Sequence, residues 1–352
     1  MGAKGDQVES LAGLDLKQFL EWFETVQPGR LPADASARLL AGGRSNLTYL
    51  VGGIESGVVV RRPPIGHVSS GAHDMGREVR VMSALASTAV PVPRVLAHCQ
   101  DVTVTGAELY VMERVPGTAY VRADDLVALG ASRTREICEA MVDTLVELHA
   151  VDPVEVGLGD FGRPGGFLRR QLSLWSRQML ATGGRPLRGA ERLRDALAER
   201  VDSIASVSIE ANTAAIVHGD YRIDNLLVDE LGVRAVLDWE LSTLGDPLTD
   251  VAALAINSDI APVLRDVPEL GDVGSAPGFL TGAEVIERYI AASGRPVGDL
   301  TFHLALSCFK SAAILEGVHR RHVDGTAVDG AFARVGQAVE PLIEQGLAQL
   351  RR

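Results

Sequence analysis

The sequence predicts an α+β protein of two lobes, a small β-rich N-terminal lobe and a larger, mainly helical C-terminal lobe. Three observations lead to this prediction. At 352 residues the chain is longer than one compact core usually organises. Short apolar runs bounded by turn residues dominate up to about residue 114. After Gly117, apolar residues recur at helical spacing instead.

The N-terminal lobe is expected to begin with a helix and to continue as a sheet. Residues 14–26 carry apolar side chains at helical spacing, and two short apolar runs follow on either side of a glycine-rich turn. The predicted elements are a helix over 14–26, strands over 47–51 and 58–61, a helix over 74–87 that ends before Pro91 and Pro93, and a strand over 108–114.

The C-terminal lobe is expected to be mostly helical. Strong helical periodicity marks residues 133–150, 167–180, 190–204 and 301–318, and short strands are predicted at 216–217, 226–228 and 235–237. The predicted organisation is therefore an N-terminal lobe over 1–112, a hinge over 113–117 and a C-terminal lobe over 118–352.

The composition is that of an ordinary soluble globular protein, with 46% hydrophobic and 23% charged residues. The formal net charge of −12 argues against nucleic acid or an anionic membrane as the main partner. The three cysteines show no zinc spacing. The N-terminus lacks the apolar core of a signal peptide, and no run approaches the ~18 to 20 apolar residues of a membrane helix. A cytoplasmic location is expected.

The most informative motif is Val217-His218-Gly219-Asp220-Tyr221-Arg222-Ile223-Asp224-Asn225, followed by Val236-Leu237-Asp238-Trp239-Glu240. Transfer of a phosphoryl group from a nucleotide needs one carboxylate to orient the attacking hydroxyl. It also needs an amide oxygen and a second carboxylate to hold Mg²⁺. Each residue alone also fits a turn or a helix cap. Together, on a strand–loop–strand–strand layout, they are expected to meet at one edge of one small sheet.

These residues resemble a known family. His218-Gly219-Asp220 to Asn225, with Asp238 downstream, resembles the catalytic core of the aminoglycoside phosphotransferase family, which has the protein-kinase-like fold. The likeness runs from about residue 38 to 255. It extends to the N-terminal lobe, where Arg61 occupies the place of the fold's phosphate-binding lysine and Glu78 that of the acid which pairs with it.

A closer resemblance is to the phosphotransferase-like domain found beside, or fused to, some acyl-CoA dehydrogenases. The motifs that carry it are Arg61-Arg62-Pro63-Pro64, Gly162-Arg163-Pro164-Gly165-Gly166, and Asp238-Trp239-Glu240 leading to Gly245-Asp246-Pro247. This resemblance implies a functional link to an acyl-CoA dehydrogenase partner.

The family likeness and the chemistry jointly predict roles in the C-terminal lobe. Asp220 would orient the substrate hydroxyl, and Asn225 and Asp238 would ligate Mg²⁺ between the phosphates of ATP. Arg222 is placed to reach the γ-phosphate, although an exposed structural arginine fits equally well. His218 and Asp250 are expected to hold the catalytic loop, and His149 to cap its own helix.

In the N-terminal lobe the family likeness implies a nucleotide site. Ser45 and Asn46 belong to the loop that would cover the phosphates, and the backbone from Glu113 to Val115 would meet the adenine edge. Arg61 and Arg62 alternate along one strand and must point to opposite faces; we expect Arg61, paired with Glu78, to face the nucleotide. Arginine is a planar clamp and not a simple replacement for lysine.

A small-molecule hydroxyl is the expected acceptor. Only about a dozen residues separate Asp238 from Asp250, which leaves no room for the activation segment of a protein kinase. An aminoglycoside-like compound and a hydroxyacyl metabolite both remain open as acceptors, and Lys310, isolated on an apolar helix, could face them. The alternative is a nucleotide-binding protein with weak or no turnover that acts with a dehydrogenase, because Arg61 replaces lysine.

Overall fold

The computed structural model describes residues 11, 13–40, 46–65, 74–181, 185–210, 214–265, 267, 270–295, 297–325 and 334–351. The chain divides into two compact units. The first unit comprises Met1–Pro116 together with Ala235–Glu240, and the second comprises Gly117–Arg234 and Leu241–Arg352. The boundaries that we predict from the sequence for the two lobes and the hinge (1–112, 113–117 and 118–352) stay a prediction.

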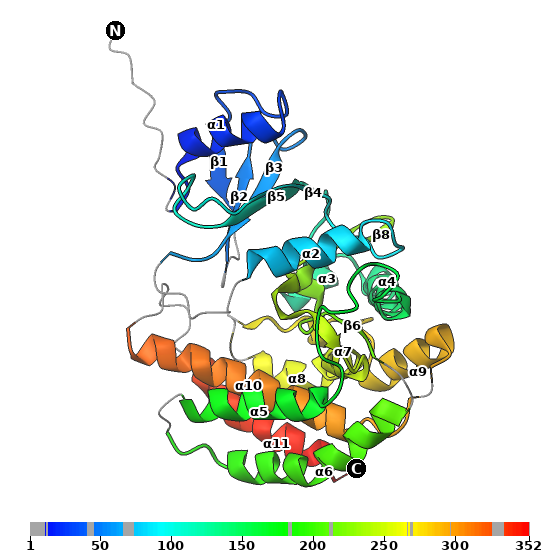
Figure 1. The fold of residues 1–352 in the computed structure, drawn as a ribbon. Coiled ribbons are helices and arrows are strands. Elements are labelled where there is room, and N and C mark those ends of the chain that lie inside the picture. Colours follow the sequence, from blue (N-terminus) through cyan, green and yellow to red (C-terminus); the bar gives the residue numbers. More distant parts are fainter. Residues whose placement is uncertain are drawn as a thin grey trace. The chain divides into compact units, whose positions relative to one another are not determined.

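The first unit contains a five-stranded antiparallel sheet with the order β1-β2-β3-β5-β4. Helix α1 lies against this sheet (Figure 1), and the two share one hydrophobic core that includes Phe19, Phe23, Tyr49, Val60 and Val111. The elements of this unit are α1 (Leu16–Val26), β1 (Ala37–Leu39), β2 (Leu47–Val51), β3 (Val58–Arg62), α2 (Met75–Leu85), β4 (Val95–Cys99) and β5 (Leu109–Glu113).

Aspartates begin both helices of this unit. The side chain of Asp15 accepts a hydrogen bond from the backbone N–H of Gln18 at 3.0 Å, and Asp74 accepts one from Arg77 at the same distance. Such caps satisfy backbone N–H groups that the first turn of a helix leaves unpaired. The cap at Asp74 fixes the start of α2, the helix that carries Glu78.

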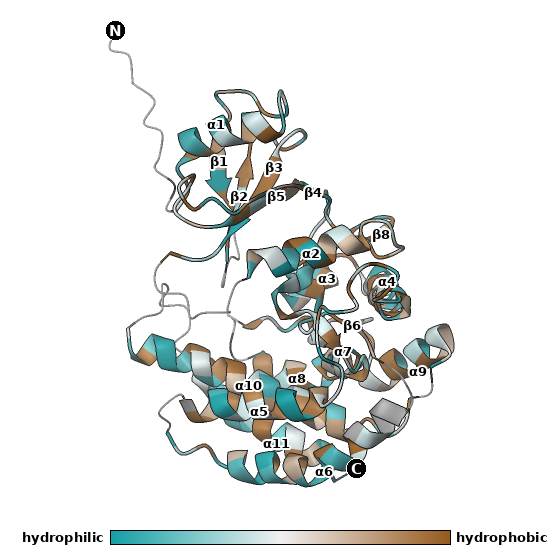
Figure 2. Ribbon diagram, in the orientation of Figure 1, coloured by the Kyte–Doolittle hydropathy of each residue, from teal (hydrophilic) through white to brown (hydrophobic). Residues whose placement is uncertain are grey.

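The second unit is mainly helical. Its helices are α3 (Ala123–Val127), α4 (Ala131–Ala150), α5 (Phe167–Ala181), α6 (Ala190–Glu210), α7 (Leu248–Ala255), α8 (Asn257–Leu264), α9 (Gly282–Ser293), α10 (Thr301–Val323) and α11 (Val339–Gln349). Helices α5, α6, α10 and α11 bury a common core around Trp175, Leu193, Phe309 and Ile343. Figure 2 shows apolar and polar residues alternating along α5 and α6, as expected for helices with one buried side.

The short strands between residues 215 and 245 form two pairs and not the single small sheet that the sequence predicts. Strand β6 (Ala215–Val217) pairs with β9 (Thr243–Gly245), and β7 (Leu226–Asp229) pairs with β8 (Gly232–Val236). Strand β9 is too short to show periodicity, so no pattern in the sequence indicates that β6 pairs with it and not with its neighbour in sequence. No helix in the described part of the chain is both long and apolar enough to cross a membrane.

Candidate active site

The loop that carries Asp220 follows β6, whose residues are all buried. Gly219 adopts a φ of +85°, and a Cβ at this position would lie 2.6 Å from the carbonyl oxygen of Leu241. Only glycine fits this turn without strain. After Asp220, one turn of 3-10 helix over Ile223–Asn225 leads into β7. The sharp turn at Gly219 therefore sets where Asp220 leaves the strand.

The buried carboxylate of Asp250 on α7 holds this loop. Its Oδ2 accepts a hydrogen bond from the backbone N–H of His218 at 2.7 Å, and its Oδ1 accepts one from that of Gly219 at 2.9 Å. Burial would raise the pKa of Asp250, but hydrogen bonding and charge from His149 and His218, together with the Gly219 N–H, outweigh burial and lower it. Asp250 is therefore an ionised brace, as the family likeness implies.

His149 does not cap its own helix, and that expectation is wrong. The ring is buried, its Nε2 lies 3.5 Å from Asp250 Oδ2, and its Nδ1 lies 2.9 Å from the hydroxyl of Tyr289 on α9. The partners are 101 and 140 positions away in the chain, so local sequence could not indicate them. His149 supports Asp250 from behind.

Asp220, Arg222 and Asn225 lie together in the second unit. The backbone N–H of Asp220 donates to His218 Nδ1 at 3.2 Å, and its carboxylate lies 3.4 Å from Arg222 Nε. Asn225 Nδ2 donates to the Asp220 carbonyl at 2.9 Å and to its Oδ2 at 3.2 Å. No described residue donates to the Oδ1 of Asn225, so the amide orientation that holds Asp220 leaves this oxygen available as a ligand.

The surroundings of Asp220 favour its ionised form. Burial would raise the pKa of this carboxyl, but Arg222, Lys310, His218 and the Asn225 hydrogen bond together lower it. Arg222 also donates to Asp224 at 2.8 Å. A carboxylate that stays ionised can accept a hydrogen bond from an alcohol, which is the property needed to orient an attacking hydroxyl.

The first unit brings together Arg61, Glu78 and Asp238. Arg61 Nε lies 3.1 Å from Glu78 Oε2, and Arg61 Nη2 donates to Asp238 Oδ1. Tyr110 on β5 pairs with Arg61 on β3, and its hydroxyl donates a hydrogen bond to Glu78 at 2.9 Å. Arg62 points away and donates to the carbonyls of Gly13 and Thr105. The two arginines thus separate as strand alternation predicts.

This group is buried and electrostatically coupled. Glu78 is 0% exposed, and burial raises its pKa although Arg61 opposes the shift. Burial alone would lower the pKa of Arg61, but Glu78, Tyr110 and Asp238 outweigh it and raise the pKa. Arg61 remains charged in every accessible condition and is the cation that makes burial of Glu78 tolerable.

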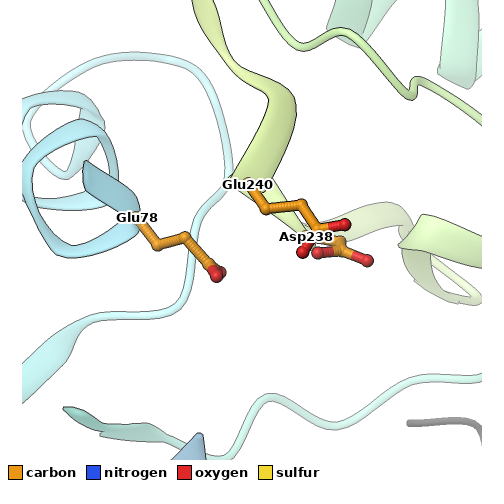
Figure 3. A group of neighbouring side chains, drawn as sticks. All are labelled: Glu78, Asp238 and Glu240. Atoms are coloured by element: carbon orange, nitrogen blue, oxygen red, sulfur yellow. The ribbon is translucent and has the colours of Figure 1, made fainter. Parts of the chain in front are cut away.

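Three carboxyl groups gather at this point (Figure 3). Glu78 from α2 and Asp238 and Glu240 from the segment after β8 each offer an oxygen, and these atoms lie within 4.8 Å of one another. Asn46 Nδ2 donates to Glu78 at 3.2 Å and to Glu240 at 3.3 Å. Glu240 was not among the residues that the sequence singled out for metal binding, although it closes the same motif as Asp238.

The backbone of Asp238 is unusual. Its φ is +64°, and it is the one non-glycine residue in the described part of the chain with a positive φ. Aspartate tolerates this left-handed conformation better than most residues, and such conformations gather at functional sites. The strained backbone turns the chain between β8 and the 3-10 turn Trp239–Leu241.

Three other residues are predicted to contact the nucleotide, namely Ser45, Glu113 and Val115. Ser45 lies outside the described residues. The side chain of Glu113 pairs with Arg94, and its backbone N–H donates to the Arg94 carbonyl at 2.9 Å. Val115 follows the end of β5. The predicted magnesium site that Asn225 and Asp238 would share stays a prediction.

Comparison with known proteins decides the family. The model of the phosphotransferase enzyme family matches residues 36–295. The chain belongs to this family. It is 36% identical to the mouse acyl-CoA dehydrogenase family member 10 over 86% of this chain and 28% of that protein. It is also 36% identical to the chicken acyl-CoA dehydrogenase family member 11, over 91% of this chain and 41% of that protein. The chain thus spans less than half the length of these relatives.

Solved structures agree with the fold. A candidate aminoglycoside phosphotransferase from Ralstonia eutropha is 33% identical, with a TM-score of 0.78, over 96% of this chain and 98% of that chain. A thermostable mutant of the aminoglycoside phosphotransferase APH(4)-Ia, solved with ADP and hygromycin B, is 16% identical, with a TM-score of 0.57, over 95% of this chain and 99% of that chain. The protein-kinase-like two-lobe fold is therefore confirmed, as is the expected family.

Proposed function

We propose that this phosphotransferase moves the γ-phosphate of ATP to a hydroxyl of a small molecule, with Mg²⁺ as the cofactor. The observation that carries the proposal is the Asp220 loop. Its backbone is held by His218 and Asp250, and the ionised Asp220 carboxylate accepts a hydrogen bond from Asn225. Such rigid placement of a base is what positioning catalysis of phosphoryl transfer needs.

Asp220 is the residue that orients the acceptor. Its carboxylate would accept the hydrogen bond of the attacking hydroxyl and take the proton as the new oxygen–phosphorus bond forms and the bond from the γ-phosphorus to the leaving ADP breaks. Arg222 lies beside it and would stabilise negative charge on the transferred group. Because Arg222 also pairs with Asp224, its side chain is held in place before the substrate binds.

The residues of the first unit fit a magnesium ion. Arg61 forms ion pairs with Glu78 and Asp238, and an oxygen of Glu240 lies within 4.8 Å of theirs, so three possible oxygen ligands gather at one point. The Oδ1 of Asn46 is buried, and no described residue donates a hydrogen bond to it. Carboxylate and amide oxygens are the ligands that Mg²⁺ prefers. Asp238 and Glu240 would hold the ion, which when bound neutralises charge on the phosphates, and Asn225 remains a predicted ligand.

Arg61 and Glu78 would serve the nucleotide. The structure commits the Arg61 guanidinium to Glu78 and Asp238, which orients one planar donor set next to the carboxylate cluster. We propose that it clamps the phosphates in place of a lysine. Ser45, Asn46, Glu113 and Val115 remain predicted contacts of the nucleotide, and the ADP bound to APH(4)-Ia supports ATP as the donor.

A second candidate function rests on the relatives. The mouse and chicken relatives carry the names of acyl-CoA dehydrogenases and continue well beyond the matched segment. A nucleotide-binding protein that acts with a dehydrogenase partner and turns over weakly is the alternative. On the first reading, the acceptor is an aminoglycoside-like compound or a hydroxyacyl metabolite.

The nucleotide site can be tested by thermal unfolding with ATP, with and without Mg²⁺. We expect a magnesium-dependent stabilisation of about 2.7 kcal/mol at a hundredfold excess of ligand over its Kd. Asp238→Asn and Glu240→Gln should each weaken the magnesium-dependent part. The exposed Glu155→Gln variant, which lies outside the cluster, is the matched control. Equal stabilisation in all four proteins would refute the proposed ligands.

A further inference from the structure

Lys310 is an isolated cation in an apolar setting. The chain has three lysines, at positions 4, 17 and 310, and Lys310 lies in the middle of α10 among buried residues that include Cys308, Phe309 and Ala312. Lysine is a costly choice beside a hydrophobic core, since its ammonium loses hydration there. Burial accordingly lowers the pKa of Lys310, with Asp220 opposing the shift.

The ammonium of Lys310 lies at the catalytic loop. Its Nζ donates a hydrogen bond to the carbonyl of Gly219, the residue before Asp220, and lies 5.4 Å from the centre of the Trp175 ring. An ammonium has three N–H donors, and the Gly219 carbonyl takes one of them. Trp175 is itself held, because its Nε1 donates to Gln171 at 3.1 Å. Lys310 is partly exposed, so a donor remains for an incoming oxygen.

The charged groups around Lys310 affect which acceptors it can contact. Arg222 and Lys310 both act on the Asp220 carboxylate, and Arg222 is shared with Asp224. Asp250 acts on Lys310 as well, so three carboxylates and two cations lie near the base. The Lys310 ammonium would repel an acceptor ammonium placed beside it, whereas an oxygen with partial or full negative charge would find an incompletely solvated ammonium.

We propose that Lys310 is an acceptor-binding residue that selects for charge: it donates to a neutral or anionic oxygen of the acceptor near the hydroxyl that is phosphorylated, and it disfavours acceptors with an ammonium there. This inference rests on the proposed function and narrows its acceptor class. Of the acceptors considered above, it favours the hydroxyacyl type over the polycationic aminoglycoside type.

The test uses three small probes with the same two-hydroxyl skeleton, namely glycerate, glyceramide and aminopropanediol. They differ in carrying a carboxylate, an amide or an ammonium. The full chain, Lys310→Met, Lys310→Arg and the control Lys17→Met are compared; Lys17 is an exposed lysine of α1. Two readouts are kept separate. The first is phosphoryl transfer from ATP. The second is protection of Lys310 from amine acetylation by each probe in the presence of Mg²⁺ and ADP, followed by mass spectrometry.

We expect the wild-type chain to prefer glycerate and glyceramide to aminopropanediol. Lys310→Met should lower kcat/KM for glycerate about tenfold or more, since a hydrogen bond to a charged group is lost. The kcat/KM values for the three probes should then become similar. Lys310→Arg should keep the order, and Lys17→Met should match the wild type. A merely structural lysine would lower all three rates together and leave their order unchanged, which would overturn the inference.

The two proposals can fail separately. Protection of Lys310 by glycerate but not by aminopropanediol, without transfer of phosphate, would uphold the role of Lys310 and refute the proposed function. Transfer that follows the same order in Lys310→Met as in the wild type would uphold the function and refute the role of Lys310. Absence of both transfer and protection with all three probes would refute both.

Discussion

At the scale of single residues, the pairing of Arg61 with Glu78 is central to the first unit. Glu78 is fully buried, and its partners among the described residues are Arg61, Asn46 and Tyr110. Removing one partner of a buried charged pair leaves the other charge without compensation, which costs more than the pair itself contributes. Arg61 is therefore needed for folding as well as for the proposed nucleotide site.

Arg61→Met should destabilise the chain by about 3 to 5 kcal/mol. Adding Glu78→Gln should recover a large part of this loss, because the uncompensated carboxylate is gone. Urea unfolding of the single and double variants measures both effects. Arg320→Met is the matched control. Arg320 on α10 forms an exposed ion pair with Asp324, and its loss should destabilise the chain by about 1 kcal/mol or less. No recovery in the double variant would contradict the proposed pairing.

Asp250→Asn should destabilise the chain in a pH-dependent way. The pKa of Asp250 is lowered in the folded state, so its stabilising effect is present above the unfolded pKa of about 3.9 and is lost as pH falls through the folded pKa. At neutral pH we expect a loss of about 2 to 3 kcal/mol. The difference from wild type should shrink below about pH 4.

Unfolding free energies of wild type and Asp250→Asn across this pH range provide the measurement. Asp34→Asn, at an exposed turn, serves as the control. A difference that stays constant from neutral to acid pH would show that the ionised carboxylate is not what braces the loop.

Single residues also show what the sequence could and could not predict about the site. Asp220, Asn225 and Asp238 stand in one short stretch with a recognisable spacing, so their chemistry could be inferred directly. The support from His149 comes through a contact between residues about a hundred positions apart, which no local pattern encodes. Glu240 could have been found, because it lies two positions after Asp238 and offers the same type of ligand.

At the scale of elements, the turn after β6 is the feature on which the catalytic loop depends. Gly219 combines a positive φ with a close approach to the Leu241 carbonyl. A side chain here would strain the backbone and push β6 away from the segment that leads to β9. Since Asp220 is the next residue, the base would move with the strand.

Gly219→Ala should therefore destabilise the chain by about 1 to 3 kcal/mol and reduce phosphoryl transfer further than the loss of stability explains. Gly106→Ala separates the effect of backbone strain from the effect of the close approach to Leu241. Gly106 has a similar φ of +81°, but a Cβ there meets nothing within 4 Å, so only the backbone strain is introduced. Thermal unfolding and transfer rates of both variants are compared. Equal losses in stability would mean that the close approach to Leu241 has no effect.

Elements with strong local signals were predicted well. The strand over 47–51 matches β2, and the predicted helices of the larger lobe correspond to α4, α5, α6 and α10 with ends shifted by a few residues. The pairing of β6 with β9 was missed because it joins segments separated by the whole catalytic motif. Three-residue strands carry too little periodicity to be recognised.

At the scale of the whole molecule, the family is established, and the reaction and acceptor are proposals. The first unit contributes an arginine and a cluster of carboxyl groups, and the second contributes a braced aspartate. The two relatives extend far beyond the matched segment, and a link to a dehydrogenase is a proposal. The decisive question is whether phosphate reaches a hydroxyl.

The most direct measurement is the fate of the γ-phosphate. The protein is incubated with ATP labelled on that phosphate, Mg²⁺ and a set of hydroxylated small molecules, beside Asp220→Asn. We predict that label appears in an organic phosphate ester, that its formation needs Mg²⁺, and that Asp220→Asn retains nucleotide-induced stabilisation but loses at least about a hundredfold in rate. Label that stays in ATP or appears only as inorganic phosphate, equally in both proteins, would contradict the proposed phosphotransferase activity.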